Sequence, residues 1–161
     1  MFNIGDRVVY PMYGAGIIEA LEEKPVDGVL KTYYVLKITY NNLKISLSVD
    51  RAEERGFREI TDKQTVLDII YNTVPINMPS NWNVRYQENL ARIKGGDLTD
   101  VVRVYKTLTL RERIKSLSSI EKKMLTNTRQ IVTSEIMLSQ NIDKTQAEAL
   151  LQAGLMNLSA S

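Results

Sequence analysis

Residues 27–49, with the sequence DGVLKTYYVLKITYNNLKISLSV, decide the fold of the first half of the chain. Asp27-Gly28 predicts a tight hairpin turn, because a type I′ turn needs positive φ at both central residues and this dipeptide tolerates it. Residues 32–40 are the most strand-like run in the chain. After a second tight turn at Asn41-Asn42, residues 43–49 alternate between apolar and polar, which is typical of a strand with one face in water. The stretch therefore predicts successive strands joined by tight turns.

Strand-like segments also precede this stretch. Residues 7–10 are rich in β-forming side chains and stop at Pro11, and Gly14-Ala15-Gly16 permits a sharp bend before the apolar segment 17–21. Four or five short strands within about 60 residues favour a small, strongly bent sheet or partly open barrel of the SH3 or Tudor kind.

After Thr61 the apolar residues recur with the period of helices. We predict five helices, separated by the Pro-containing loop 74–79, by Gly95-Gly96 and by two shorter breaks. The residues expected to cap their N-termini are Asp62, Ser80 or Asn81, Asp97, Ser118 and Asp143. The predicted fold class is therefore α+β, with a Tudor/SH3-like β domain over residues 1–60 and an all-α domain over residues 61–161.

The composition argues against common kinds of chemistry. The 161 residues include no cysteine and no histidine, so thiolate metal sites, disulfides, Cys nucleophiles and Ser-His-Asp triads are excluded. Carboxylate or Lys catalysis and Mg²⁺ held by Asp and Glu survive this filter, but the sequence shows no spacing that would cluster carboxylates, and we expect no enzymatic activity, no metal and no cofactor. The N-terminus does not resemble a signal peptide, and no stretch approaches the roughly 18 apolar residues that span a bilayer, which predicts a cytoplasmic protein.

The formal charge of +2 hides an uneven distribution. Residues 1–60 hold 8 basic and 9 acidic side chains, whereas residues 85–129 hold eleven basic and five acidic ones, a local charge of +6. A basic stretch of this size can bind phosphates. It can equally be the solvated surface that helices need, and charge by itself does not decide between the two.

The aromatic residues also have two interpretations. Trp82 opens a predicted helix next to polar residues, so it either packs into the helical core or lies exposed, where it could stack on a base or insert into a duplex step. In the β half, Tyr10, Tyr13, Tyr33, Tyr34 and Tyr40 are either ordinary strand residues or an aromatic cage for a methylated lysine.

Three blocks of sequence, in order along the chain, resemble the CarD/CdnL family of bacterial transcription regulators. They are Ile4-Gly5-Asp6-Arg7-Val8-Val9-Tyr10-Pro11 with Gly14 and Gly16, then Asn81-Trp82-x-x-Arg85-Tyr86-x-x-Asn89-Leu90 with Gly96-Asp97, and finally Leu117-Ser118-x-x-Glu121-Lys122-x-Met124-Leu125 with Arg129-Gln130-Ile131. A domain similar to the first block also occurs in the transcription-repair coupling factor. The second and third blocks point to the stand-alone regulators.

The resemblance implies a function for each half. It implies that the β domain docks on the β subunit of RNA polymerase by a sheet edge, in the region of Lys24, Pro25, Val26 and Ser46. Lys24 and Ser46 stand where relatives commonly have Arg, so the details of this contact differ.

For the helical half, the resemblance implies contact with promoter DNA near the upstream edge of the transcription bubble. Trp82 would act there as a wedge, and the basic residues near the DNA backbone would be Arg85, Lys122, Lys123 and Arg129.

We therefore expect a transcription regulator that binds RNA polymerase and stabilises the promoter open complex, acting as a monomer, with a dimer left open. The main alternative is an adaptor whose Tudor-like barrel binds a modified or basic peptide while the helices form a scaffold. It predicts a tyrosine cage and a buried Trp82. A self-sufficient helix-turn-helix repressor is a further alternative, and the modest net charge argues against it.

Overall fold

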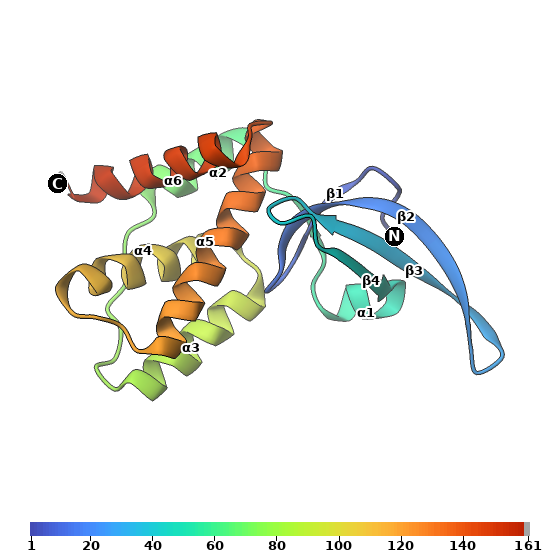
Figure 1. Ribbon diagram of the computed structural model, residues 1–161, viewed down its shortest axis with the longest axis horizontal. Helices are drawn as coiled ribbons and strands as arrows, with labels where there is room; N and C mark the ends of the chain where they lie inside the picture. Colours follow the sequence, from blue (N-terminus) through green and yellow to red (C-terminus); the bar gives the residue numbers. More distant parts are fainter. Residues whose placement is uncertain (160–161) are drawn as a thin grey trace.

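The computed structural model of the chain describes residues 1–159 and contains a β domain followed by a helical domain (Figure 1). This arrangement confirms the α+β prediction. The β domain is a five-stranded antiparallel sheet with the strand order β4-β3-β2-β1-β5. Its strands are β1 (Arg7–Tyr10), β2 (Gly14–Val26), β3 (Val29–Ile38), β4 (Lys44–Ser48) and β5 (Arg58–Glu59), and the short helix α1 (Val49–Glu54) lies between β4 and β5.

The β2–β3 hairpin is longer than the strands around it. Asp27 and Gly28 form its turn with φ of 52° and 80°, as the Asp-Gly signal predicts. β1 pairs only with residues 14–17 of β2, and β4 pairs only with residues 33–37 of β3. The end of the hairpin is therefore flanked by no other strand, and Figure 1 shows it projecting away from the rest of the molecule.

The sheet closes over a small core of its own. Val8, Ile18, Tyr34 and Leu36 are among its buried side chains, and Phe57 packs against them. The segment after β4 was predicted incorrectly: residue 49 begins α1 instead of ending a strand, because the Ser48 hydroxyl accepts a hydrogen bond from the Arg51 amide and caps the helix.

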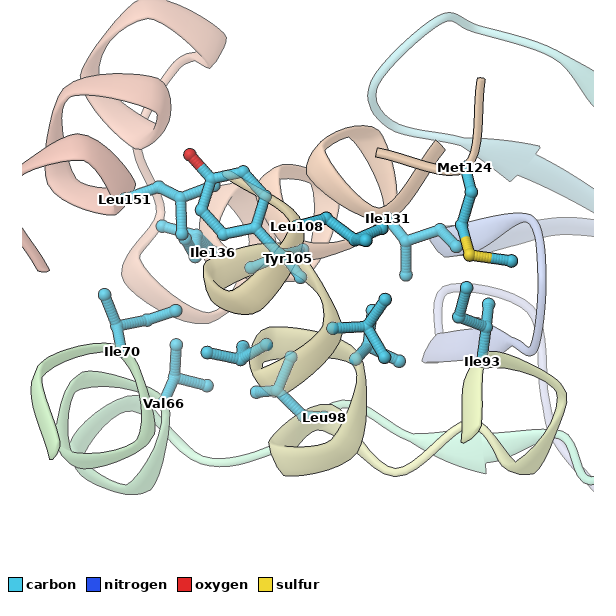
Figure 2. Close-up of a cluster of buried hydrophobic side chains, with 14 of the residues drawn as sticks. Val66, Ile70, Ile93, Leu98, Tyr105, Leu108, Met124, Ile131, Ile136 and Leu151 are labelled. Carbon is cyan, nitrogen blue, oxygen red and sulfur yellow. The ribbon is translucent and has the colours of Figure 1, made fainter. Parts of the chain in front are cut away.

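The five predicted helices are present in the second half. They are α2 (Lys63–Asn72), α3 (Trp82–Gly95), α4 (Leu98–Ile114), α5 (Ser119–Gln140) and α6 (Lys144–Ser159). Asp62, Asn81, Asp97 and Ser118 cap four of them as predicted, and at the start of α6 Asp143 and Gln146 hydrogen-bond to one another's backbone amides. Figure 2 shows the core that these helices share, in which Ile70, Leu108 and Ile136 are fully buried.

The β domain packs against the C-terminal half of α5 (Figure 1). Gly14 allows the close approach, because it has a φ of +114° and a Cβ there would lie 2.7 Å from the Ser134 hydroxyl. The same hydroxyl accepts a buried hydrogen bond of 2.8 Å from the Ala15 amide. Arg7 adds a hydrogen bond of 2.6 Å to the Leu138 carbonyl. The two domains are therefore joined by specific polar contacts as well as by the chain.

Candidate nucleic-acid interface

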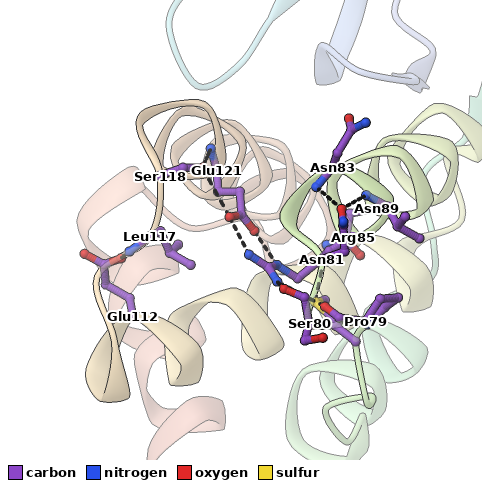
Figure 3. Close-up of polar contacts among 12 residues, drawn as sticks. Pro79, Ser80, Asn81, Asn83, Arg85, Asn89, Glu112, Leu117, Ser118 and Glu121 are labelled. Atoms are coloured by element: carbon purple, nitrogen blue, oxygen red, sulfur yellow. Dashed lines mark hydrogen bonds and ion pairs between the residues drawn. The ribbon is translucent and has the colours of Figure 1, made fainter.

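Trp82 is the first residue of α3 and lies on the surface, with 53% of the residue exposed. The Asn81 side chain fixes the start of the helix by accepting hydrogen bonds from the amides of Asn83 and Val84, at 3.0 and 3.2 Å (Figure 3). The indole is thus held on a capped helix turn with about half of its surface open to solvent, where it can stack on a flat partner.

Arg85, one turn later on α3, points into the protein and pairs with Glu121 on α5. Its Nε and Nη2 donate to the two carboxylate oxygens at 2.6 and 2.8 Å, and its Nη1 donates to the carbonyls of Pro79 and Ser80 (Figure 3). Arg85 is 4% exposed and Glu121 1%. The pair fastens the first turn of α3, and the loop before it, to the first turn of α5.

The electrostatics of this pair keep both groups charged. The hydrogen bond from Arg85 lowers the pKa of the Glu121 carboxyl against the opposing effect of burial, and the hydrogen bond to Glu121 raises the pKa of Arg85. The Ser118 hydroxyl adds a hydrogen bond of 3.2 Å to the same carboxylate. The resemblance implies that Arg85 approaches the DNA backbone. In this structure its guanidinium is buried and engaged by Glu121 and two backbone carbonyls, so it positions the turn that carries Trp82.

Lys122 and Lys123 follow Glu121 directly and are exposed at the same end of the helical domain. Neither side chain forms an ion pair with any other described residue. Lys123 lines a hollow of about 250 Å³ between α3 and α5, together with Tyr86 and Ile120. Tyr86 is four residues after Trp82, and residues at this spacing share one helix face. The structure therefore places an exposed indole, a tyrosine and two ammonium groups without an ion-pair partner at the end of the helical domain where the first turns of α3 and α5 meet.

Tyr86 and Ile120 were not predicted as site residues. The spacing of Trp82 and Tyr86 is a signal that could have identified Tyr86, whereas the contribution of Ile120, 39% exposed, depends on how α3 and α5 pack.

Arg129 is exposed but lies apart from this surface. It is seven residues after Lys122 on α5, about 10 Å along the helix. There it lines a different hollow, with Tyr40 of the β domain, Tyr105 of α4 and Glu148 of α6. Arg129 therefore faces the junction of these elements instead of extending the surface around Trp82.

The basic stretch also contains a lysine that is not on the surface. Lys106 is 0% exposed, and its ammonium donates to the carbonyls of Ile70 and Thr73 at the C-terminal end of α2, at 2.6 and 2.8 Å. Burial lowers its pKa to about 8. With Arg85 and Lys106 in the interior, the basic surface is smaller and more local than the charge of +6 indicates.

The residues expected to bind polymerase lie on the β domain, away from α3. Ser46 is on β4, which is an edge strand of the sheet, and Lys24, Pro25 and Val26 are on the projecting hairpin. The Lys24 ammonium donates to the Ser46 hydroxyl at 3.2 Å. This contact joins the hairpin and the edge strand into one surface, which also includes the exposed side chain of Leu30 beside Pro25.

The five tyrosines of the β domain do not surround one open site: Tyr13 is 47% exposed, but its ring stacks on that of Tyr10 with the centroids 4.5 Å apart. Tyr10 and Tyr34 are buried, and their rings pack against Phe57. Tyr33 and Tyr40 are instead each covered by a cation of the chain itself, the ammonium groups of Lys24 and Lys144 at 5.0 and 3.8 Å from the ring centroids. An exposed Trp82 and these covered rings are the opposite of what the peptide-binding adaptor predicts.

Two further features are absent from residues 1–159. No group of three or more His, Cys, Asp or Glu side chains there could hold a metal ion. No helix in that range combines the length and the apolar character needed to cross a membrane.

Comparison with known proteins agrees with both halves of the fold. Residues 2–61 match the family model of the CarD-like/TRCF RID domain, and residues 65–152 match that of the CarD C-terminal domain. The chain is also 32% identical over 151 residues to a protein of Bacillus subtilis (strain 168) named "Putative transcription factor YdeB", a match that covers 92% of this chain and 99% of the relative.

A RID-type β domain followed by a CarD helical domain defines a class of transcription regulator. This chain belongs to the CarD family.

Proposed function

We propose that this protein docks on the β subunit of RNA polymerase through its β domain and stabilises the promoter open complex through the surface around Trp82. The observation that carries the proposal is the exposed indole on the first turn of α3, locked by the buried Arg85–Glu121 pair beside the free ammonium groups of Lys122 and Lys123. The arrangement combines a flat apolar side chain with cations, which is the combination that unstacked bases and their phosphates require.

The indole stabilises the open state by differential affinity. At the upstream edge of the bubble the last base pair has lost a stacking neighbour, so Trp82 gains a stacking partner there that closed duplex does not offer. A stacking contact contributes about 1–3 kcal/mol, which shifts the ratio of open to closed complexes by roughly 5- to 150-fold when it is fully realised. The lysines contribute phosphate contacts that do not depend on base sequence.

Docking on polymerase raises the local concentration of the protein at the DNA, which a DNA-contacting surface this small needs. The edge strand β4 leaves one row of backbone groups without a partner strand, so a strand of the polymerase can pair with it while Lys24, Ser46 and the hairpin contact flanking side chains. Once the protein is bound there, contact with DNA becomes intramolecular, and weak contacts suffice.

The experiment that tests this proposal measures the lifetime of open complexes on a promoter that forms short-lived ones, with the full-length chain added. We expect the wild-type chain to lengthen the lifetime and Trp82→Ala to lose at least about fivefold of that effect, since it removes the stacking contact. Val84→Ala is the matched control, because Val84 is 47% exposed on the same helical turn but is aliphatic. Equal lifetimes with the wild-type chain and Trp82→Ala would show that the indole does not act on the open state.

A further inference from the structure

Arg58 joins three elements at the junction of the two domains. It lies on β5, and its Nη1 and Nη2 donate to the two carboxylate oxygens of Glu135 on α5 at 2.9 and 2.8 Å. Its Nε donates to the carbonyl of Gly96, the C-terminal cap of α3, at 2.9 Å. One guanidinium therefore connects the β domain to α5 and to the end of α3 opposite Trp82.

Glu135 receives a further hydrogen bond from the β-domain side. The amide of Thr61, in the segment that leads from β5 to α2, donates to it at 2.9 Å. Glu135 is 1% exposed, so water cannot solvate its carboxylate if Arg58 is removed. Its two oxygens accept three hydrogen bonds, all from residues 58–61, which strongly restricts how that segment can lie on α5.

The apolar part of the junction is small and less directional. Its buried members are Val9, Ala15 and Leu138, and the partly buried Met12 packs against the helical core, so it is far smaller than the core of either domain. Apolar contacts of this size permit sliding, and relative motion is the usual behaviour of domains joined by a small interface. A bidentate Arg–carboxylate pair has fixed geometry and so resists such motion.

The same helix carries the other bidentate Arg–Glu pair among the described residues, Arg85–Glu121. Glu121 and Glu135 are 14 residues apart on α5, about 21 Å along its axis. Glu121 holds the Trp82 end of α3 through Arg85, and Glu135 holds the β domain and, through Arg58, the Gly96 end of α3. α5 therefore holds both ends of α3. Near its own N-terminus it contacts the Trp82 end, and near its C-terminus it contacts the β domain and, through Arg58, the Gly96 end.

We propose that the Arg58–Glu135 pair is a positioning element that holds the polymerase-docking β domain and Trp82 at one fixed separation, an inference that rests on the proposed function. A fixed separation places the indole at one point on the DNA once the β domain is docked. A variable separation spreads it over many points, which lowers its effective concentration at the bubble edge.

The separation can be measured directly, because the chain has no cysteine and two can be introduced for spin labels. Lys31→Cys on the hairpin and Gln87→Cys on α3 are both at exposed positions. In this background we expect one narrow distance distribution for the otherwise wild-type chain. We expect a broad one for Glu135→Gln and for Arg58→Lys, since Gln cannot accept both guanidinium bonds and Lys lacks the planar fork. Glu59→Gln is the matched control, being exposed and adjacent to Arg58.

The functional arm compares the same variants in the open-complex assay. We expect Glu135→Gln and Arg58→Lys to bind polymerase as the wild-type chain does and to lose about tenfold of its lifetime effect. A double variant, Arg58→Met with Glu135→Leu, separates positioning from folding, because an apolar pair can restore the melting temperature without the directional bonds. We expect it to melt like the wild-type chain and still give a broad distribution.

Each outcome bears on one proposal. A narrow distribution in all three variants overturns the positioning role. A broad distribution with an undiminished lifetime effect overturns the claim that fixed separation matters. If the wild-type chain itself neither binds polymerase nor lengthens the lifetime, the proposed function fails, and the claim for positioning fails with it whatever the distances.

Discussion

Arg85 illustrates how the position of a charge in the sequence differs from its place in the structure. Its motif is one of those by which the chain resembles the CarD family, and its neighbours are polar, yet its side chain makes four hydrogen bonds inside the protein. An arginine has five N–H donors, so this guanidinium has almost no capacity left for a phosphate. The partner that decides this, Glu121, is 36 residues away, and no local pattern around Arg85 identifies it.

Replacing Arg85 by methionine tests this structural role. We expect Arg85→Met to lower the free energy of unfolding by about 3–5 kcal/mol at pH 7, because it leaves the Glu121 carboxylate buried without its partner. Lys94→Met, an exposed substitution on the same helix, should change it by less than about 0.5 kcal/mol. Urea denaturation measures both, and a second substitution, Glu121→Leu, should recover most of the loss.

The effect should also depend on pH. The pKa of Glu121 is lowered below 4.5 in the folded chain, so the unfolded chain binds more protons as the pH falls. The stabilisation is therefore complete above about pH 4.5 and is lost as the pH falls through the folded pKa. The difference between wild type and Arg85→Met should shrink from pH 7 to pH 4, and a constant difference would contradict this assignment.

Lys106 gives a prediction at alkaline pH. Burial lowers its pKa from 10.5 to about 8, so between these values the unfolded chain holds a proton that the folded chain has released. Stability from this group therefore rises with pH. Relative to Lys106→Met, the free energy of unfolding of the wild type should increase by about 1 kcal/mol between pH 7 and pH 9. A difference that does not change with pH would show that Lys106 keeps its ordinary pKa.

At the scale of elements, local signals predicted most of the structure. The Asp27-Gly28 turn, four helix caps and the end of α2 before Pro75 each depend on residues close in sequence, and each is found as predicted. The errors are at places where an element is very short or where distant contacts decide. α1 and β5 are too short to show a period. Residues 22–26 continue β2, and Pro25 is tolerated there because the hairpin end has no neighbouring strand on the β1 side.

The site was predicted less completely than the fold. Trp82, Lys122 and Lys123 were singled out and share one end of the helical domain, whereas Arg85 is buried and Arg129 faces the junction with the β domain. Sequence spacing places residues on a helix face. It does not say which face meets another helix, and that contact decides which charges are free.

The β2–β3 hairpin is the element expected to meet polymerase. Leu30 is 66% exposed near its tip, so Leu30→Asp should leave the fold intact. It should weaken binding of the full-length chain to an isolated polymerase β lobe by about tenfold or more, because the new carboxylate would lose its water in the interface. Ile114→Asp is the matched control, since Ile114 is 88% exposed at the end of α4. Binding titrations measure both, and equal weakening by the two substitutions would remove the hairpin from the interface.

At the scale of the whole molecule, the remaining question is whether DNA responds to the overall charge or to one surface. Lys122→Gln with Lys123→Gln removes two charges from the Trp82 end. Lys63→Gln with Lys144→Gln removes two from the starts of α2 and α6, on the side of the helical domain opposite α3 (Figure 1). The two double variants have the same net charge of 0, so the comparison between them separates the place of the removed cations from their number.

These variants separate the two explanations through salt dependence. Each lysine that neutralises a phosphate adds about 0.7 to 0.9 to the slope of log affinity against log salt. If Lys122 and Lys123 both contact phosphates, their double variant should lower by about 1.5 the slope measured for the chain's effect on open complexes, and should leave the stacking contribution of Trp82 in place. The other double variant should leave the slope unchanged, because its lysines are remote from the DNA. If the two double variants lowered the slope equally, the overall charge of the protein would be what attracts DNA. The surface around Trp82 would then not be the part that contacts the phosphates.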